Sequence, residues 1–360
     1  MTHTSALPKL RPLSLGELLD QAIRLYRRNF FKFIGIIAAV QVPVTLINII
    51  VTILTFDDFY SVAIDPSRIE ASSDPLSVFT PGYFLGIGGT MLVSFLSFLL
   101  IQGIAAGALT RLVSDMYLGQ SSGIEEAFSR IGKRWLPLIG TLLVYIILFV
   151  LLFVWFIVPC LGWATGPGMM VVFGGMVLPL LAPVVVLETS SGLGAIRRAW
   201  ELVRKRFWWI FGFMFILYLF SWLVVSGPAT LFATATSYVL PSTGFTGDNA
   251  LLLQTILQSL ISLVFSILYY PLQLACATLL YFDLRIRQEG LDLMLQAEGQ
   301  SRQTLNLSEL IAQTPPAPRG SLITWGEVGY MVLIAIGFVG IYAAFTFVLF
   351  GIAMAAMGGF

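Results

Sequence analysis

The sequence predicts an all-α protein that crosses a membrane several times, and three observations lead to this prediction. The 360 residues are 58% hydrophobic and 11% charged, whereas soluble domains carry roughly 25% charged residues. The apolar residues gather in seven runs, each long enough for the roughly 20 residues that a membrane-spanning helix needs. A short basic and aromatic motif also recurs three times, each time directly before an apolar run. A bilayer, rather than one water-soluble core, must therefore cover most of the apolar surface.

The apolar runs define seven predicted spans, at residues 31–56, 83–112, 135–159, 169–187, 207–228, 250–281 and 328–357. The Gly- and Pro-rich stretch 160–168 predicts a tight turn that joins the third and fourth spans as a hairpin. The fourth span contains Pro179 and Pro183, which neighbouring helices must accommodate. The sixth span is long enough to tilt, or to kink at Pro271.

The distribution of charge predicts the orientation of the spans. With the N-terminus on the cytoplasmic side, nineteen of the twenty Lys and Arg residues fall on that side, and only Arg68 falls outside. Cytoplasmic loops carry such an excess of Lys and Arg. We therefore expect a cytoplasmic N-terminus, an outside C-terminus, and polar outside loops at 57–82 and 229–249. The net charge of +1 gives no indication of a nucleic-acid partner.

The repeated motif occupies residues 21–35, 126–140 and 198–212, which align without a gap. Each copy has an alanine, a bulky apolar residue, a basic cluster, an aromatic residue and an apolar run containing a glycine. The pattern predicts a helix on the cytoplasmic surface that bends into a span. These cations either set the topology alone or bind anionic headgroups or a protein partner. The candidate contact residues are Arg27, Arg28, Lys133, Arg134, Arg204, Lys205 and Arg206.

Ser14 and Glu17 match a capping box at the start of the first surface helix, and the same spacing recurs at Ser122 and Glu125. We expect interfacial helices near 14–29, 121–134, 190–206 and 281–294. The chain divides into a flexible N-terminus (1–13), a six-span core built on the three repeats (14–294), a cytoplasmic linker (295–320) and the seventh span (321–360). The linker is expected to be extended because it ends in Pro-Pro-Ala-Pro.

Six amide side chains fall within the predicted spans, and none of these positions is charged. A proton or ion pathway is therefore not indicated. These residues either make hydrogen bonds between helices or line a polar route for a substrate. They are Gln41, Asn48, Gln102, Gln254, Gln258 and Gln273.

Two further motifs concern packing and pairing. Gly103 and Gly107 form a GxxxG in the second span, which permits close approach of another helix of this chain or of a second copy. After the sixth span, Asp283 with Arg287 and Arg285 with Glu289 are spaced for ion pairs on a helix. This helix either leaves the membrane with its charges paired or presents them as a docking surface.

We expect no catalytic residues, no metal and no cofactor. The sequence has one histidine, His3, and it contains no GxSxG, HExxH, P-loop or CxxC motif. Its two cysteines, Cys160 and Cys276, lie in apolar stretches without metal-ligand or disulfide spacing. The function is therefore predicted to be non-enzymatic.

Three stretches resemble a known family. Residues 12–20 with 24–28, 199–203 and 279–290 are similar, in this order, to bacterial proteins with a glycerophosphoryl diester phosphodiesterase membrane domain. The resemblance covers roughly 12–295 and implies a location in the bacterial cytoplasmic membrane. It does not imply phosphodiesterase activity, because the soluble catalytic module, with its paired histidines and metal-binding carboxylates, is missing from this chain.

Two functions remain open at this point. The first is a membrane scaffold or accessory subunit whose basic surface helices engage anionic lipids or a protein partner, including a second copy of the chain. The second is a transporter or permease-like protein for a lipid or amphipathic small molecule. A cavity that reaches the middle of the membrane favours the second function, and a fully packed interior favours the first.

Overall fold

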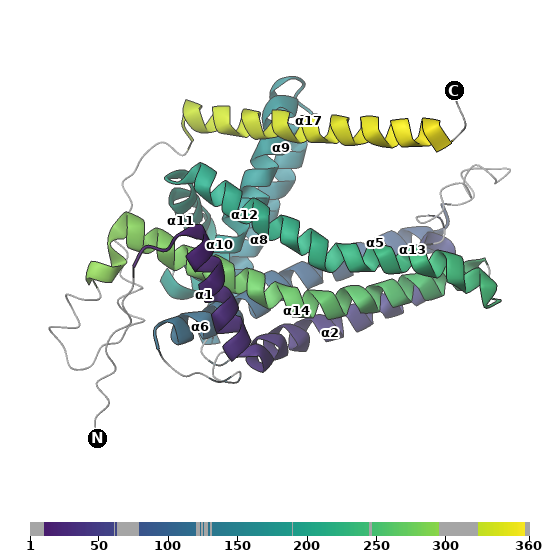
Figure 1. Ribbon diagram of the computed structural model, residues 1–360, viewed down its shortest axis with the longest axis horizontal. Coiled ribbons are helices and arrows are strands. Elements are labelled where there is room, and N and C mark those ends of the chain that lie inside the picture. The colour runs from purple at the N-terminus through teal and green to yellow at the C-terminus, as the bar shows by residue number, and fades with distance from the viewer. Residues whose placement is uncertain are drawn as a thin grey trace. The chain divides into compact units, whose positions relative to one another are not determined.

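The computed structural model describes residues 11–60, 62, 79–119, 123, 125, 129, 132–188, 190–244, 247–294 and 323–356. These residues form helices joined by short turns, with no strand in the described ranges (Figure 1). Seven helical stretches are long and apolar enough to cross a membrane. The protein is therefore an all-α, multi-pass membrane protein. The stretches are Phe30–Leu54, Pro81–Tyr117, Trp135–Trp155, Leu161–Glu188, Phe207–Leu240, Asp248–Glu289 and Trp325–Val348.

The chain forms two compact units. The first combines Met1–Ile139 with Ile216–Leu305, and the second combines Gly140–Phe215 with Asn306–Phe360. Residues 140–215, which the sequence analysis assigns to the six-span core, thus cluster with the seventh span.

The first unit contains the N-terminal surface helix and the first span, followed by the second span, which a π-helical turn interrupts. It also contains the last part of the fifth span and the whole of the sixth. Their bounds are α1 (Leu15–Arg28), α2 (Phe30–Leu54), η1 (Phe56–Tyr60), α5 (Pro81–Leu99), η3 (Leu100–Ala105), α6 (Ala106–Tyr117), η4 (Gly132–Arg134), the end of α12 (Phe207–Ser221), η6 (Trp222–Ser226), α13 (Gly227–Ser242) and α14 (Asp248–Glu289).

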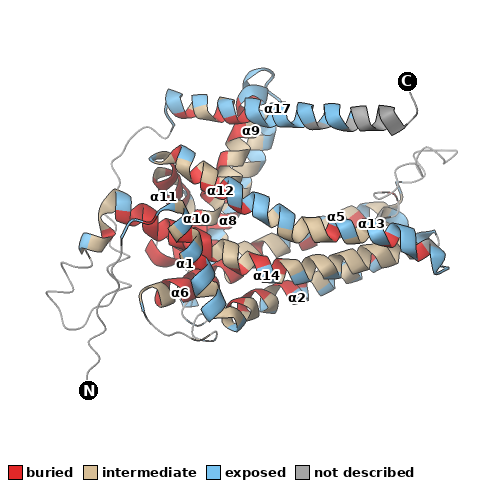
Figure 2. Cartoon of the chain, viewed as in Figure 1, coloured by how far each residue is buried: buried red, intermediate tan, exposed pale blue. Residues whose placement is uncertain are grey.

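Helix α14 is the centre of the first unit. It contacts α2 and α13, and α1 and α6 lie against it as well (Figure 1). Its 42 residues extend over about 63 Å, roughly twice the 30 Å thickness of the hydrocarbon core. The two halves of α14 consequently have different surroundings. Residues 275–286 are all buried, whereas the first half is mostly of intermediate exposure (Figure 2).

The second unit contains most of α8 (Trp135–Trp155), followed by α9 (Leu161–Val172), η5 (Phe173–Val177), α10 (Leu178–Glu188), α11 (Gly192–Arg204), the first part of α12 and α17 (Trp325–Ala356). Helix α17 packs against α9. This contact requires a glycine, because a Cβ atom on Gly168 would lie 1.8 Å from the carbonyl oxygen of Met331. The seventh span therefore packs on the fourth within the same chain.

Two predicted loops are wrong. Residues 160–168 are helical from Leu161 onward, and the turn lies before them, at Cys160 with its φ of 63°. The glycines here serve close packing, since a Cβ on Gly162 would lie 2.1 Å from the carbonyl oxygen of Trp155. Most of the predicted outside loop 229–249 is likewise helical, as α13. Its polar residues fit a helix because the hydroxyls of Thr230, Thr234 and Thr236 donate to carbonyls one turn earlier.

The surface helices differ in how far they match the prediction. Helix α1 has the predicted capping box: Ser14 accepts from the Glu17 amide, and Glu17 accepts from the Ser14 amide at 2.8 Å. Helix α11 covers the third predicted surface helix. The predicted exit helix is the continuous end of α14, which stops where Gly290 takes a left-handed conformation (φ 64°). The predicted cap at Ser122, nearly all of 121–131, and the linker 295–320 lie outside the described residues.

Candidate functional site

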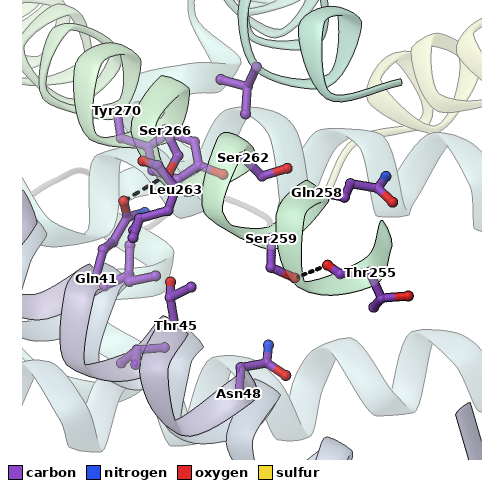
Figure 3. Close-up of a pocket in the computed structure, with 13 residues that line it drawn as sticks. Gln41, Thr45, Asn48, Thr255, Gln258, Ser259, Ser262, Leu263, Ser266 and Tyr270 are labelled. Atoms are coloured by element: carbon purple, nitrogen blue, oxygen red, sulfur yellow. Dashed lines mark hydrogen bonds between the residues drawn. The ribbon is translucent and has the colours of Figure 1, made fainter. Parts of the chain in front are cut away.

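A cavity of ≈ 410 Å³ opens between α2 and α14 in the first unit (Figure 3). This volume lies within the range of ligand pockets, roughly 300 to 1,000 Å³. Helix α2 contributes Gln41, Thr45 and Asn48 to its polar lining. Helix α14 contributes Thr255, Gln258, Ser259, Ser262, Ser266 and Tyr270.

Helical periodicity brings these polar side chains together. On α2 the residues follow one another at intervals of four and three, so they share one face of the helix. On α14 the residues from Thr255 to Ser266 follow the same rule over three turns. In Figure 3 the stripe on α2 and the stripe on α14 point toward the same space. Both helices otherwise have the apolar composition of membrane spans, so the polar face is a local feature of each.

Three of the hydroxyl groups on α14 donate their protons to other oxygens of the chain. Thr255 donates to the carbonyl oxygen of Leu251 at 2.8 Å, and Ser259 donates to the carbonyl oxygen of Thr255 at 2.9 Å. The Ser266 hydroxyl lies 2.9 Å from the Gln41 side-chain oxygen and 2.9 Å from the carbonyl oxygen of Leu263. Such hydroxyls present only oxygen lone pairs to the cavity.

Besides Tyr270, four other polar side chains of the lining have no partner within the described part of the chain. They are Thr45, Asn48, Gln258 and Ser262. Each can both donate and accept a hydrogen bond. Polar groups in a membrane interior are costly unless they are hydrogen-bonded, so these four side chains are suited to a polar occupant.

The remainder of the lining is apolar and comes from four helical segments: Val44, Ile101, Val225 and Leu263. Two of these residues lie in π-helical turns, Ile101 in η3 and Val225 in η6. π-Helical turns inside α-helices occur frequently at functional sites. Each of these two turns thus contributes one residue to the cavity wall, which is polar in one part and apolar in another.

None of the residues that line this cavity is ionisable at neutral pH. The lining contains no Asp, Glu, Lys, Arg or His, and its one phenol is that of Tyr270. The cavity therefore offers hydrogen bonds without any compensating charge for an ion.

The structure brings together three of the six amide residues predicted from the sequence, namely Gln41, Asn48 and Gln258. Gln254 instead donates to the carbonyl oxygen of Ala233 at 2.9 Å and links α14 to α13. Gln102 and Gln273 are half-buried and lie outside the lining. The Ser and Thr residues of the lining were not among the residues predicted from the sequence. Their recurrence at helical spacing within α14 is the signal that would have found them.

A second polar region, the charge cluster, consists of Asp283, Arg285, Arg287 and Glu289 at the other end of α14. Arg287 pairs with Asp283 at 2.9 Å, and Arg285 pairs with Glu289 at 3.0 Å. The Arg285 guanidinium also donates to the Tyr281 hydroxyl at 3.1 Å. Both predicted i,i+4 pairs are present.

The charge cluster also holds the N-terminal segment. The Leu13 amide donates to the Asp283 carboxylate at 2.7 Å, and the Leu13 carbonyl accepts from the Arg287 guanidinium at 2.5 Å. Asp283 is 1% exposed and Arg285 is fully buried. The alternative prediction that these charges form a docking surface is therefore wrong for Asp283 and Arg285, because their side chains face the protein interior.

Helix α1 is fixed to α14 at a second point. The Tyr26 hydroxyl donates to the carbonyl oxygen of Leu268 at 2.8 Å, and partial burial raises the pKa of Tyr26. Leu18 and Ala22 on the apolar face of α1 are fully buried. Helix α14 of the same chain therefore covers this part of the apolar face of the predicted surface helix.

The predicted basic contact residues have different surroundings. Arg27 and Arg28 on α1 are exposed, as is Lys205. Arg204 instead pairs with Glu327 at 2.7 Å, and Arg206 lies over the ring of Trp209 at 5.4 Å. Arg134 is half-buried, and the side chain of Lys133 lies outside the described residues.

Two carboxylates of the second unit are buried in ion pairs. Glu188 accepts from Arg198 at 2.7 Å, and Glu327 is the partner of Arg204. Both carboxylates are buried, so these ion pairs fix α10 to α11 and the start of α17 to the end of α11. Arg204 thus has a structural partner within the chain.

Gly103 and Gly107 are buried, and the segments that carry them contact α2 and α14 of the same chain. No group of three or more His, Cys, Asp or Glu residues that is suited to a metal ion occurs among the described residues. The free cysteines are an exposed Cys160 and a buried Cys276.

Comparison with known proteins returned no matching family model, curated protein or solved structure.

Proposed function

We propose that this protein is a transporter or permease-like protein for an amphipathic small molecule or lipid, and that the cavity between α2 and α14 is its binding site. The observation that supports this function is a partly polar, partly apolar cavity inside the spanning part of the first unit. A fully packed interior would have favoured a scaffold instead.

The depth of the cavity supports this proposal. Gln41 follows the start of α2 by eleven residues, which corresponds to about 16 Å along a helix. This distance is roughly half the thickness of the hydrocarbon core. The lining then continues to Asn48, about 27 Å from the start of α2. In the orientation that the charge distribution favours, the cavity extends from the middle of the bilayer toward the outer surface.

We further propose a non-enzymatic role in the bacterial cytoplasmic membrane, with a cytoplasmic N-terminus and membership in the glycerophosphoryl diester phosphodiesterase membrane-domain family. Two of the stretches that carry this resemblance are in contact, because Asp283 and Arg287 bind the backbone of Leu13. A shared structural role for the two stretches explains why they occur together in one sequence.

A scaffold that engages anionic lipid or a protein partner remains a second candidate. One observation favours it: Arg24, Arg27 and Arg28 stay exposed on α1, while the apolar face of the same helix is covered by α14. Exposed cations next to a span attract anionic headgroups, at about 1 kcal/mol per residue. This basic surface is compatible with a transporter as well. By itself it accounts only for binding to a membrane surface.

Flux in liposomes tests the proposed function. The purified full-length chain is reconstituted, and the transfer of fluorescent short-chain lipids between leaflets is measured for the native protein and for Asn48→Leu and Gln258→Leu. We expect faster transfer with the native protein and at least a tenfold loss in each variant. Gln273→Leu is the matched control, since Gln273 lies on α14 outside the cavity. Equal transfer by all four proteins would contradict the proposal.

A further inference from the structure

We propose that the occupant of the cavity is an amphiphile with an uncharged, hydroxyl-rich headgroup, such as a glycosyl diacylglycerol, and that lipids with a phosphate headgroup are excluded. This inference rests on the proposed function and adds the chemical class of the ligand. It follows from the hydrogen-bonding state of the lining, from the charge of the lining and from its apolar part.

The hydrogen-bonding state requires a ligand that donates. Thr255, Ser259 and Ser266 have given their hydroxyl protons to other oxygens, so they can only accept from an occupant. The free amides of Asn48 and Gln258 offer one acceptor and two donors each. A sugar or polyol hydroxyl both donates and accepts, and it can therefore bind both kinds of group. The phosphate group of a diester only accepts, so by itself it leaves the three back-bonded hydroxyls without a donor.

The absence of charge in the lining also favours a ligand with an uncharged headgroup. No Lys, Arg or His lies among the residues that line the cavity, and no Asp or Glu does. Moving an ion out of water without a paired opposite charge is very costly. Anionic headgroups and ammonium headgroups are both disfavoured for this reason, whereas a neutral headgroup incurs no such cost.

The apolar part of the lining indicates that the ligand carries a hydrocarbon portion. Val44, Ile101, Val225 and Leu263 form this part, and the outward face of α2 next to it exposes Leu46, Ile47 and Ile50. An acyl chain can pack against Val44 and leave the cavity along this face. A free sugar uses only the polar side chains, and it leaves the apolar wall in contact with water.

Lipid binding in nanodiscs of defined composition tests this inference. Phosphatidylcholine nanodiscs that hold the full-length chain are doped with galactosyl diacylglycerol or with phosphatidylglycerol of the same acyl chains. Native mass spectrometry then measures the lipid that stays bound after release of the protein. A third arm of the experiment uses methyl galactoside in solution. It shows whether the ligand is a lipid or a soluble molecule with the same headgroup chemistry.

We expect at least tenfold more galactosyl diacylglycerol than phosphatidylglycerol on the native protein. Asn48→Leu and Gln258→Leu should each remove most of this bound lipid, whereas Gln273→Leu should retain it. Gln258→Lys keeps a polar side chain at the cavity and adds a cation, so it should shift the preference toward phosphatidylglycerol. This variant keeps the test decisive if a leucine variant fails to fold.

Two results would overturn the inference and leave the cavity between α2 and α14 as the proposed binding site. One is that the native protein binds both lipids equally and that Gln258→Leu reduces the binding of both to the same extent. This result would mean that the cavity does not discriminate between charged and uncharged headgroups. The other is variant-sensitive binding of methyl galactoside without lipid binding, which would mean that the ligand is soluble. If none of the three ligands binds in a way that depends on Asn48 or Gln258, both the inference and the proposed function are overturned.

Discussion

The two polar regions of α14 differ in charge and in how far their groups are satisfied. In the charge cluster, Asp283 and Arg285 are buried and every pair is formed within the chain. In the cavity, the side chains are uncharged, and Gln258 and Ser262 have no partner among the described residues. Buried charges that form ion pairs within the chain hold a fold together, whereas unpaired neutral polar groups in a membrane are available to a ligand. We infer that the first region is structural and the second is functional.

The largest expected effect comes from breaking the charge cluster. Asp283→Ala removes the partner of both Arg287 and the Leu13 amide, and truncation of one partner of a buried ion pair costs about 3–5 kcal/mol. We expect a large drop in the unfolding midpoint of the purified protein, measured by tryptophan fluorescence in detergent. Asp20→Ala is the control, because Asp20 is exposed on α1. Equal midpoints for the two variants would show that the cluster does not stabilise the fold.

The same comparison predicts the opposite behaviour for the cavity. Gln258→Leu removes an amide without a described partner, so stability should change by less than about 0.5 kcal/mol or increase slightly. Binding of the galactosyl lipid should nevertheless fall at least tenfold. Thermal unfolding and native mass spectrometry on the same preparation measure both quantities. A loss of stability as large as that of Asp283→Ala would assign Gln258 a structural role instead.

The adjacent residues Tyr269 and Tyr270, on α14 between the cavity and the charge cluster, provide a matched pair of variants. We expect a smaller effect on stability from this pair. The Tyr269 hydroxyl donates to the carbonyl oxygen of Leu217 at 2.6 Å, whereas Tyr270 lines the cavity. Tyr269→Phe should cost about 1 kcal/mol, the typical contribution of one such hydrogen bond. Tyr270→Phe should leave stability nearly unchanged. Chemical unfolding of the two variants checks the difference, and a larger loss in Tyr270→Phe would contradict the assignment.

The smallest effect concerns the start of α1. The backbone amide of Ser14 and the guanidinium of Arg11 hold the pKa of Glu17 below the ordinary value for glutamate, 4.5. A lowered folded pKa adds stability that is present above this value and is lost as the pH falls through the folded pKa. Glu17→Gln should therefore slightly lower the unfolding midpoint at pH 7 and reduce its decline below about pH 4.5. Identical pH profiles for the native protein and the variant would mean that the capping box contributes nothing measurable.

Local patterns in the sequence predicted several features correctly. Run length and composition gave all seven spans, and the spacing of Ser14 and Glu17 gave the capping box. The spacing of Asp283 and Arg287 gave an ion pair that is present. Each of these features depends on residues within a few turns of one another, and helix geometry fixes such relations.

Features that depend on distant residues could not be predicted in this way. The contact between Leu13 and Asp283 joins residues 270 positions apart, and no periodicity encodes it. The cavity needs polar faces on both α2 and α14, and either face alone is compatible with ordinary helix pairing. The polar composition of α13 also suggested a loop, because the sequence does not indicate that its threonines bond to their own helix.

A cryo-electron microscopy map of the protein in nanodiscs that contain galactosyl diacylglycerol tests the central claim most directly. Our account predicts density for a headgroup between Asn48 and Gln258, in contact with the Ser262 hydroxyl, and a charge cluster unchanged around Leu13. A cavity closed by its own side chains, or lipid density confined to other surfaces, would contradict it.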